Sequence, residues 1–377
     1  MSMPPTRPIT SVDGVIPDIP GSPVDLQYAK ELRTKVAQLL QLNHERFPGA
    51  QPVSFLKEHI DTLKNEDFFV CEKSDGVRCL VYAVFSSMGH PETYLIDRKN
   101  IYRHVPQLYI PIPSDPARPK FHNGTLFDGE LIIDREPNGR SYLRLYCFDL
   151  LAVGGKCVTD RPLTNRLGYL NEHVILPFNT LMKANPSFAR STPFTIILKY
   201  MQFSYGAPKV LKEEIPKLHH KNDGLIFTSV NAPYVVGTTE KMLKWKAADE
   251  NSVDFRVNLR YPTGSESSQK PMFVLSVWQG GKDYTPFAEM AVTDADWRDF
   301  RRNNIQFENR IVEVCYDPHH NPPAKWKFMR FREDKPHGNH ASVVDKILQS
   351  IRDGVEEEEL IKQSAEIRTA YKARVGQ

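Results

Sequence analysis

The sequence predicts an α+β protein of two domains, in which a larger domain of antiparallel sheets flanked by helices precedes a small β-barrel. Short runs of β-branched and aromatic residues, bounded by turn residues, recur from about residue 66, and their close spacing favours antiparallel strands. Helical spacings of apolar residues occur at 25–40, 161–185 and 341–372. Five more strand-like runs follow Trp245-Lys246, which is typical of a partly open barrel of the OB type.

The composition restricts the class of protein. The 377 residues include 49 Lys+Arg and 46 Asp+Glu, a net charge of +3, which excludes a histone-like polycation but not a local basic cleft. The five cysteines are odd in number and form no Cys-x-x-Cys pair, so we expect reduced thiols rather than disulfides or a zinc site. No apolar run reaches the ~18 residues of a membrane helix and no signal-peptide pattern is present, so we expect a soluble protein with no membrane partner.

Composition and periodicity divide the chain into four segments. Residues 1–24 are rich in proline and are expected to form a flexible arm. Residues 25–247 form the larger domain, residues 248–340 the OB-fold domain, and residues 341–377 a helical C-terminal segment.

Local signals place the elements within these segments. A helix opens at Asp25 and is broken at Phe47–Pro52, which contains two prolines and a glycine. Strands are expected in the larger domain at 68–71, 80–85, 93–98, 127–133, 142–148, 194–198, 224–228 and 241–245. In the barrel they are expected at 255–261, 272–278, 287–292, 310–316 and 326–332.

Lys73 is the first residue that could carry chemistry. It lies at the end of a short apolar strand and precedes Ser74-Asp75-Gly76. A surface lysine before a turn would explain this pattern. Alternatively the lysine is a nucleophile, which in general requires partial burial and nearby cations, because a free lysine amine has a pKa of about 10.4.

Lys244 and Lys246 could supply such cations. They alternate with Leu243 and Trp245 on a predicted strand, so both side chains project from one face. Two lysines on one face are tolerable when an anion such as a phosphate lies between them. An exposed strand edge, where lysines prevent aggregation, would explain the pattern as well.

Two carboxylates also stand next to glycine-containing turns or strands. Glu130 follows Asp128-Gly129, and Asp223-Gly224 precedes an apolar strand. Carboxylates in a phosphate-binding cleft hold Mg²⁺ or ribose hydroxyls. Ordinary turn chemistry would equally explain the two Asp-Gly pairs.

The segment 325–335 alternates basic and aromatic residues and ends in Arg332-Glu333-Asp334-Lys335. A barrel strand that packs its aromatic side chains inward would explain the alternation. The functional alternative is a clamp of guanidinium and ammonium groups on a polyphosphate.

Taken in order, these motifs resemble the signature of the covalent nucleotidyltransferases, a superfamily that contains mRNA capping enzymes and polynucleotide ligases. The motifs are Lys73-x-Asp75-Gly76, Asp128-Gly129-Glu130, Tyr146–Leu151, Asp223–Phe227, Leu243–Lys246 and Arg332-x-Asp334-Lys335. The last motif looks like the capping branch, and Phe47–Ser54 and Asn339–Val344 are similar to fungal mRNA guanylyltransferases. The resemblance covers roughly residues 25–375.

The resemblance implies a two-step transfer in which Lys73 takes GMP from GTP and then passes it to the 5′-diphosphate end of nascent RNA, forming the GpppRNA cap. In the family pattern, the residues that act near the reacting phosphorus are Lys73, Asp223, Lys244 and Lys246. The residues that contact ribose or phosphates are Arg78, Arg98, Glu130, Arg332, Asp334 and Lys335.

The base would lie between Phe148 and Ile226, with Lys199 reading guanine O6, although Tyr146 on the same strand face is an alternative stacking residue. Mg²⁺ or Mn²⁺ is expected as cofactor, near Glu130 and Asp223. A hinge near 247–249 would let the barrel close on the triphosphate.

The implied partners are GTP, 5′-diphosphate RNA, a separate RNA triphosphatase and the phosphorylated tail of RNA polymerase II, and the implied location is the nucleus. Two other functions stay open. An ATP-dependent polynucleotide ligase shares the lysine chemistry and the barrel. A non-catalytic scaffold of the same fold would bind transcription machinery without reacting.

Overall fold

The computed structural model describes residues 16–247, 251–261, 269–317 and 324–376, and it confirms the α+β class. The described chain divides into two compact units. The first unit contains the described residues up to Val53, together with Asp61–Lys244 and the residues from Ile361 onward. The second unit contains Ser54–Ile60 and the described part of Trp245–Leu360. The helical C-terminal segment is therefore shared between the two units.

The larger sheet of the first unit has the strand order β1-β6-β5-β4-β7-β8-β10, with β9 paired to β8. Its strands are β1 (Ser22–Pro23), β4 (Val77–Phe85), β5 (Pro91–Ile96), β6 (Tyr102–His104), β7 (Thr125–Arg135), β8 (Ser141–Val153), β9 (Lys156–Cys157) and β10 (Thr195–Leu198). Neighbouring strands are antiparallel as expected, except β10, which runs parallel to β8.

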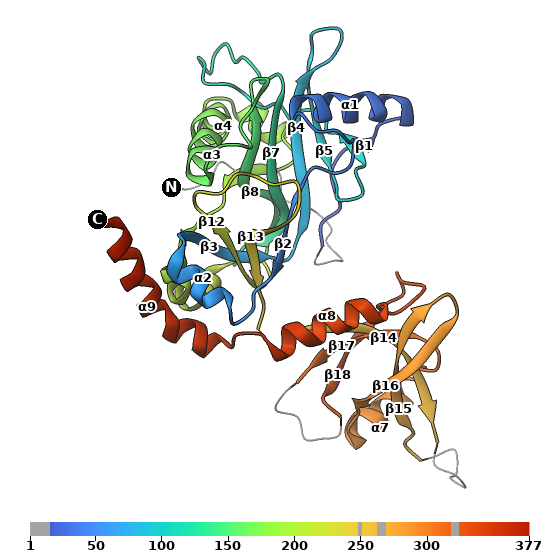
Figure 1. Ribbon diagram of the computed structural model, residues 1–377. Helices are drawn as coiled ribbons and strands as arrows, with labels where there is room; N and C mark the ends of the chain where they lie inside the picture. Colours follow the sequence, from blue (N-terminus) through green and yellow to red (C-terminus); the bar gives the residue numbers. More distant parts are fainter. Residues whose placement is uncertain (1–15, 248–250, 262–268, 318–323, 377) are drawn as a thin grey trace. The chain divides into compact units, whose positions relative to one another are not determined.

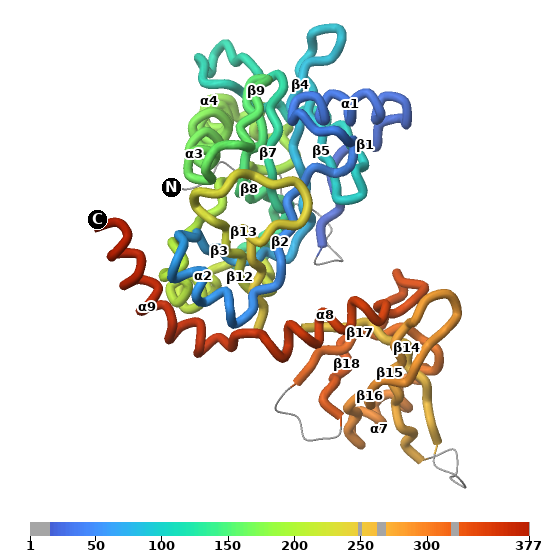
Figure 2. The backbone as a smooth tube through the Cα atoms, in the orientation of Figure 1, coloured from blue at the N-terminus to red at the C-terminus, as the bar shows by residue number. Residues whose placement is uncertain are grey.

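The smaller sheet has the order β11-β3-β12-β13-β2, and its central strands lie side by side in Figure 2. Its strands are β2 (Ala50–Ser54), β3 (Phe68–Ser74), β11 (Gln202–Phe203), β12 (Asn222–Ser229) and β13 (Gly237–Trp245). Helix α1 (Leu26–Leu39) ends before the expected break at Phe47–Pro52, and strand β2, which the sequence did not predict, starts within that segment. Pro52 is accommodated because β2 is an edge strand, where a missing N–H need not pair.

Apolar side chains bury both faces of the larger sheet. On β4, Cys79 and Val81 belong to one buried cluster, whereas Leu80 and Tyr82 belong to another, as the two-residue period of a strand requires. Helices α3 (Leu163–Leu170) and α4 (Leu176–Ala184) cover the first face (Figure 1). Helix α1 (Leu26–Leu39) and side chains of β12 and β13 cover the second, so the two sheets share a core.

Helix α1 begins where the sequence places it, because the Asp25 carboxylate accepts a hydrogen bond of 2.9 Å from the Tyr28 N–H. The remaining helices of the first unit are short. They include α5 (Pro186–Ser191) and α6 (Ala207–Lys209), while α2 (His59–Asn65) and α9 (Glu357–Val375) span the unit boundary.

The second unit is built on a closed barrel of order β14-β15-β16-β18-β17, where a partly open one was expected. The strands are β14 (Ser252–Arg260), β15 (Met272–Gly280), β16 (Asp283–Ala291), β17 (Ile311–Tyr316) and β18 (Trp326–Phe331), and helix α8 (Ala341–Arg352) packs on the barrel core through Val344. Helix α7 (Asp294–Arg302) was not expected, although Thr293 and Asp296 form a capping box that is readable in the sequence.

Two expectations concern residues that are only partly described. Of the arm at 1–24, residues 1–15 lie outside the described residues, and Ser22–Pro23 pairs with β6, which ties that part of the arm to the sheet. The expected hinge at 247–249 also falls mostly outside the described residues.

All five cysteines are free thiols. None of the described helices is long and apolar enough to cross a membrane.

A buried arginine joins three parts of the first unit. Arg166 on α3 is only 1% exposed, and its guanidinium donates to both carboxylate oxygens of Asp149 on β8, at 2.6 and 2.9 Å. It also donates to the carbonyl oxygen of Ala232, at 2.9 Å. Because both charges are buried, each needs the other to offset the free-energy cost of removing it from water.

We therefore expect Arg166→Leu to lower the free energy of unfolding by about 3–5 kcal/mol, since it leaves the Asp149 carboxylate buried without its partner. Urea unfolding followed by circular dichroism measures this change. Arg161→Ala, an exposed arginine next to the same helix, should change the value by less than about 0.5 kcal/mol. Equally small losses of unfolding free energy in both variants would show that the buried Arg166–Asp149 pair is not needed for stability.

Candidate active site

A pocket in the first unit lies where the two sheets share their core. Its lining comes from both sheets and includes seven of the residues predicted from the sequence, namely Lys73, Arg78, Arg98, Glu130, Phe148, Lys199 and Ile226. These residues are spread over 153 positions of sequence from Lys73 to Ile226, so the fold brings them together.

Lys73 is held at the junction between the two sheets. Its Nζ lies 2.5 Å from Asp223 Oδ1, and its side chain is 26% exposed. Only Asp75 and Gly76 connect β3 of the smaller sheet to β4 of the larger sheet. A Cβ on Gly76 would collide with the backbone carbonyl oxygen of Leu131, so a larger residue does not fit this crossing.

Asp223 is aimed at Lys73 by an irregularity in β12. The pairing of β12 with β3 shifts register between Asn222 and Leu225, and Gly224 has a φ of 123° that L side chains rarely adopt. The Asp223-Gly224 pair is therefore a bulge within a strand rather than a turn between strands. Bulges commonly re-aim side chains next to functional sites.

Phe148 enters the pocket through a second bulge. On β8, Asp149 pairs with Asp128 and Cys147 pairs with Gly129, so Phe148 has no partner on β7. Its ring lines the pocket. Tyr146, the alternative left open by the sequence, does not line it, and its hydroxyl donates to Asp134 at 2.7 Å.

Arg78 forms part of the pocket wall but is itself buried. Its Nε and Nη2 donate to the two carboxylate oxygens of Asp128 at 3.0 and 2.5 Å, and Nη1 donates to the Ala50 carbonyl oxygen. Its Cζ also lies 5.6 Å from the centre of the Phe148 ring. Arg78 thus joins β4 to β7 and to β2, and Asp128 is a partner that the sequence did not reveal.

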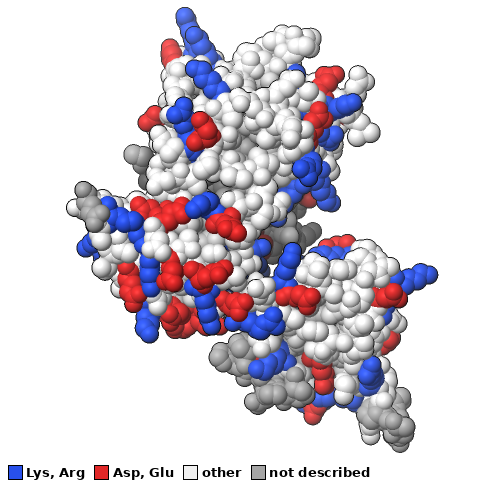
Figure 3. All heavy atoms as spheres, in the orientation of Figure 1, with Lys and Arg blue, Asp and Glu red and all other residues white. Residues whose placement is uncertain are grey.

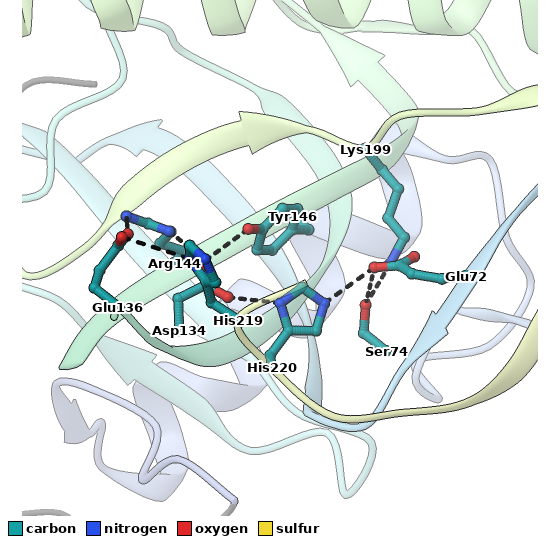
Figure 4. Close-up of polar contacts among 9 residues, drawn as sticks. All are labelled: Glu72, Ser74, Asp134, Glu136, Arg144, Tyr146, Lys199, His219 and His220. Carbon is teal, nitrogen blue, oxygen red and sulfur yellow. Dashed lines mark hydrogen bonds and ion pairs between the residues drawn. The ribbon is translucent and has the colours of Figure 1, made fainter. Parts of the chain in front are cut away.

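Lys199 reaches the pocket from the residue after β10. Its Nζ forms an ion pair with Glu72 and donates to the Ser74 hydroxyl (Figure 4). Burial by itself would raise the pKa of Glu72, but Lys199 and hydrogen bonds from His220 and Ser74 outweigh it and hold that pKa below its usual range. Glu72 directly precedes Lys73, so the same stretch of β3 positions both lysines.

A buried histidine extends this network to the other sheet. His220 is 2% exposed, and its ring nitrogens lie 3.1 Å from Glu72 on β3 and 2.6 Å from Asp134 on β7 (Figure 4). Asp134 also binds Arg144 at 2.5 Å. Burial would raise the pKa of Asp134, but its hydrogen bonds, that from His220 foremost, lower it to about 2. No sequence motif pointed to His220 or Asp134.

Glu130 differs from the other carboxylates of the pocket. Burial raises its pKa to about 7, although Lys199, Arg98 and other cations act in the opposite direction. Glu130 and Asp223 offer the oxygen atoms that Mg²⁺ prefers. No group of three or more His, Cys, Asp or Glu side chains in the described ranges is arranged to hold a metal.

Lys244 and Lys246 are placed differently from the other predicted residues. Lys244 lies on β13 and Lys246 follows that strand, and both are half-buried. Neither lines the pocket. By the division of the chain, Lys244 belongs to the first unit and Lys246 to the second.

The Arg332, Asp334 and Lys335 motif lies in the second unit, just after β18, and forms a cluster of its own. Arg332 donates to Asp254 at 3.0 and 3.1 Å and to Asp334 at 2.9 and 2.8 Å. The hydrogen bond from Arg332 holds the pKa of Asp334 well below its usual range. Lys335 also binds Asp254, a buried residue on β14 that the sequence did not single out.

Comparison with known proteins matches both parts of the chain. Residues 16–248 match the family model of the mRNA capping enzyme catalytic domain, and residues 250–361 match that of the mRNA capping enzyme C-terminal domain. The chain belongs to the mRNA capping enzyme family. This membership confirms the resemblance seen in the sequence motifs.

Relatives within the family align over almost the whole chain. The mRNA-capping enzyme subunit alpha of Schizosaccharomyces pombe is 40% identical, over 94% of this chain and 88% of that protein. The subunit alpha of Saccharomyces cerevisiae is 35% identical, over 96% and 88%. Among solved structures, a mycobacterial DNA ligase D with ATP bound is similar with a TM-score of 0.37 and 13% identity, over 76% of this chain and 95% of that one.

The buried position of His220 generates a prediction about pH. Burial lowers the pKa of His220, but hydrogen bonds to Asp134 and Glu72 outweigh it, so the folded-state pKa is raised above the usual value of about 6.5. The stabilisation from this proton is complete below about pH 6.5 and is lost as pH rises through the folded-state pKa.

Consequently, the free energy of unfolding of the native protein should fall as the pH rises from about 6.5 through the folded-state pKa of His220. In His220→Asn the free energy of unfolding should depend less on pH over the same range. Urea unfolding at a series of pH values measures it. His90→Asn, at an exposed turn, should keep the native slope. An unchanged slope in His220→Asn would show that His220 is not charged in the folded state.

Proposed function

We propose that this chain is a GTP:RNA guanylyltransferase, which moves GMP from GTP to the 5′-diphosphate end of nascent RNA through a lysyl–GMP intermediate. The observation that supports this most directly is the placement of Lys73 Nζ, half-buried and hydrogen-bonded to Asp223, in a pocket that also contains an aromatic ring and a second lysine. Family membership gives the reaction class.

In the first step, Nζ of Lys73 attacks the α-phosphorus of GTP. A P–N bond forms, the P–O bond to pyrophosphate breaks, and Nζ gives up a proton. In the second step, an oxygen of the RNA 5′-diphosphate attacks the same phosphorus, the P–N bond breaks, and Nζ regains a proton. Each displacement occurs at one fixed site, which is the advantage of covalent catalysis. Asp223 orients Nζ for both steps.

The pocket also accounts for the choice of base. Phe148 and Ile226 enclose a planar base, and the Lys199 ammonium faces the same pocket. An ammonium donor suits the O6 acceptor of guanine and repels the amino donor that adenine carries at the equivalent position. This difference separates a guanylyltransferase from a ligase that uses ATP.

The remaining predicted residues handle ribose and phosphates. In this proposal, Arg98 and Glu130 contact the ribose and nucleotide phosphates, Arg78 supports the pocket wall and approaches the nucleotide from it, and Lys244 and Lys246 hold the α-phosphate. Glu130 and Asp223 would hold Mg²⁺ or Mn²⁺, which would supply charge neutralisation for the leaving pyrophosphate.

Arg332, Asp334 and Lys335 act on the β- and γ-phosphates when the second unit closes over the nucleotide. Arg332 is held between Asp254 and Asp334, so its guanidinium is already oriented before a phosphate arrives. In this proposal, opening releases pyrophosphate and admits RNA.

The proposal extends to partners and location. The relatives are named as alpha subunits, which supports a second subunit, and an RNA triphosphatase would supply the 5′-diphosphate end. The phosphorylated tail of RNA polymerase II is the proposed docking partner, and the nucleus is the proposed location.

Labelling with α-³²P nucleotides tests the function. The native chain should form a covalent adduct with GTP and not with ATP, and Lys73→Ala should lose it, whereas Lys120→Ala, at an exposed site, should label normally. An adduct with ATP would support the ligase alternative. No adduct with either nucleotide would support the scaffold alternative, and native labelling of Lys73→Ala would refute the nucleophile.

A second prediction separates the two steps. Arg332→Ala should slow adduct formation from GTP by about 100-fold or more, because the clamp acts on the leaving pyrophosphate. Transfer to RNA from adduct collected after long incubation should fall much less. Arg330→Ala, at an exposed arginine of β18 two positions before Arg332, is the matched control and should affect neither step strongly. Equal losses in both steps would contradict the clamp.

A further inference from the structure

A second hollow in the first unit, here called the basic groove, lies beside the nucleotide pocket and has a volume of about 760 Å³. Its charged lining residues are Arg33, Arg46, Arg98, Lys99 and Glu45. Four cations thus face one carboxylate. The Glu45 side chain already accepts a hydrogen bond of 2.6 Å from the Thr34 hydroxyl. Within the described part of the chain, Arg46, Arg98 and Lys99 form no ion pair.

Hydrogen bonds hold the wall of the groove in one conformation. The Asp97 carboxylate accepts from the backbone N–H groups of Lys99 and Ile101, each at 2.9 Å. Asn100 donates to the Glu45 carbonyl oxygen at 2.7 Å, and Arg33 donates to the Asn100 carbonyl oxygen at 3.1 Å. The turn that carries Arg98 and Lys99 is therefore preorganised, which lowers the entropy cost of binding.

The basic groove continues into the nucleotide pocket. Arg98 lines both. On strand β2, Gln51 lines the basic groove and the next residue, Pro52, lines the pocket. The Phe47 ring, which also lines the groove, lies 6.0 Å from Cζ of Arg78 in the pocket wall. A molecule that reacts in the pocket can extend into the groove without leaving the first unit.

No comparable excess of cations is seen among the described residues on the face shown in Figure 3. On the face shown in Figure 3, basic and acidic side chains are interspersed, in keeping with the net charge of +3. Three polar atoms of groove residues are also buried without a hydrogen-bond partner among the described residues, namely Arg33 Nε, His44 Nδ1 and Asn100 Oδ1. Buried polar atoms without a hydrogen-bond partner are uncommon, and a molecule bound beside them is one explanation.

We propose that the basic groove binds the backbone phosphates of the RNA acceptor just behind its 5′ end. This inference rests on the proposed function, because the 5′-diphosphate must reach the phosphorus bound to Lys73 and the following nucleotides must then lie at the mouth of the pocket. A polyanion is the ligand that a row of unpaired cations favours. A phosphorylated peptide would match the charge but would have no need of continuity with the pocket.

The test uses the full chain with Arg46→Ala and Lys99→Ala combined, two exposed residues that line the groove and do not line the nucleotide pocket. Labelling with α-³²P GTP should stay at the native level. In transfer from the preformed adduct, the KM for 5′-diphosphate RNA should rise about five- to tenfold. The slope of log binding constant against log salt concentration, measured by fluorescence anisotropy with the same RNA, should become shallower by about 1.4 for two lost phosphate contacts.

The matched control combines Lys183→Ala and Arg190→Ala, exposed residues on α4 and α5 at the opposite face of the larger sheet. It should leave KM and the salt slope unchanged. An unchanged KM and slope in the groove variant would overturn the proposal. The proposal would also be overturned if the groove variant lost binding to a phosphoserine peptide while its transfer of GMP to RNA stayed normal. That result would assign the groove to a peptide. Failure of the native chain to label with GTP would instead refute the proposed function. The anisotropy measurement of RNA binding by the native chain and the groove variant would still test the groove.

Discussion

The crossing of the chain from the smaller sheet to the larger sheet is the constraint on which the site depends. β3 ends at Ser74, β4 starts at Val77, and the two strands belong to different sheets. The last residues of β3, Lys73 and Ser74, are consequently held between two sheets that share a core. Lys73 gains partial burial from this position, and it gains a carboxylate partner, Asp223, from the strand next to its own. The crossing requires Gly76 because the Leu131 carbonyl oxygen occupies the space of a side chain.

Two bulges then convert regular strands into a site. A strand alternates its side chains between two faces, so a regular β8 would place Phe148 opposite a β7 residue, and a regular β12 would continue its pairing through Asp223. The extra residue in each strand breaks the alternation. The Asp-Gly pairs at 128–129 and 223–224 lie at these irregularities, which is why their composition resembles that of turns. Gly224 adopts a φ of 123°, which other residues avoid, whereas at Gly129 a Cβ would come within 3.0 Å of the Tyr146 carbonyl oxygen.

Buried charges around the pocket are paired across the two sheets. Lys199, after a strand of the larger sheet, binds Glu72 of the smaller sheet, and His220 connects Glu72 to Asp134. Removing one partner of such a pair costs far more than the pair contributes to stability, so the pairs hold the sheets in a single arrangement. The lysine proposed to read the base is therefore positioned by the same contacts that keep the sheets together. The basic groove differs, since its cations are exposed and available to a ligand.

The sequence alone determined the features that depend on near neighbours. Alternation of apolar residues predicted the main strands, Asp25 predicted the start of α1, and the ordered motifs predicted Lys73 together with the residues that line its pocket. Strand β2 was missed because it contains Pro52, which is tolerated only where a strand lies at the edge of a sheet. Whether a strand lies at the edge is a property of the whole sheet. His220 and Glu72 are separated by 148 positions, and Asp254 and Arg332 by 78. Only the tertiary structure decided such pairings, because a buried charge takes its partner from whatever the fold places beside it. It likewise placed the Phe148 ring in the pocket wall, next to the bulge in β8, while the Tyr146 hydroxyl donates to Asp134.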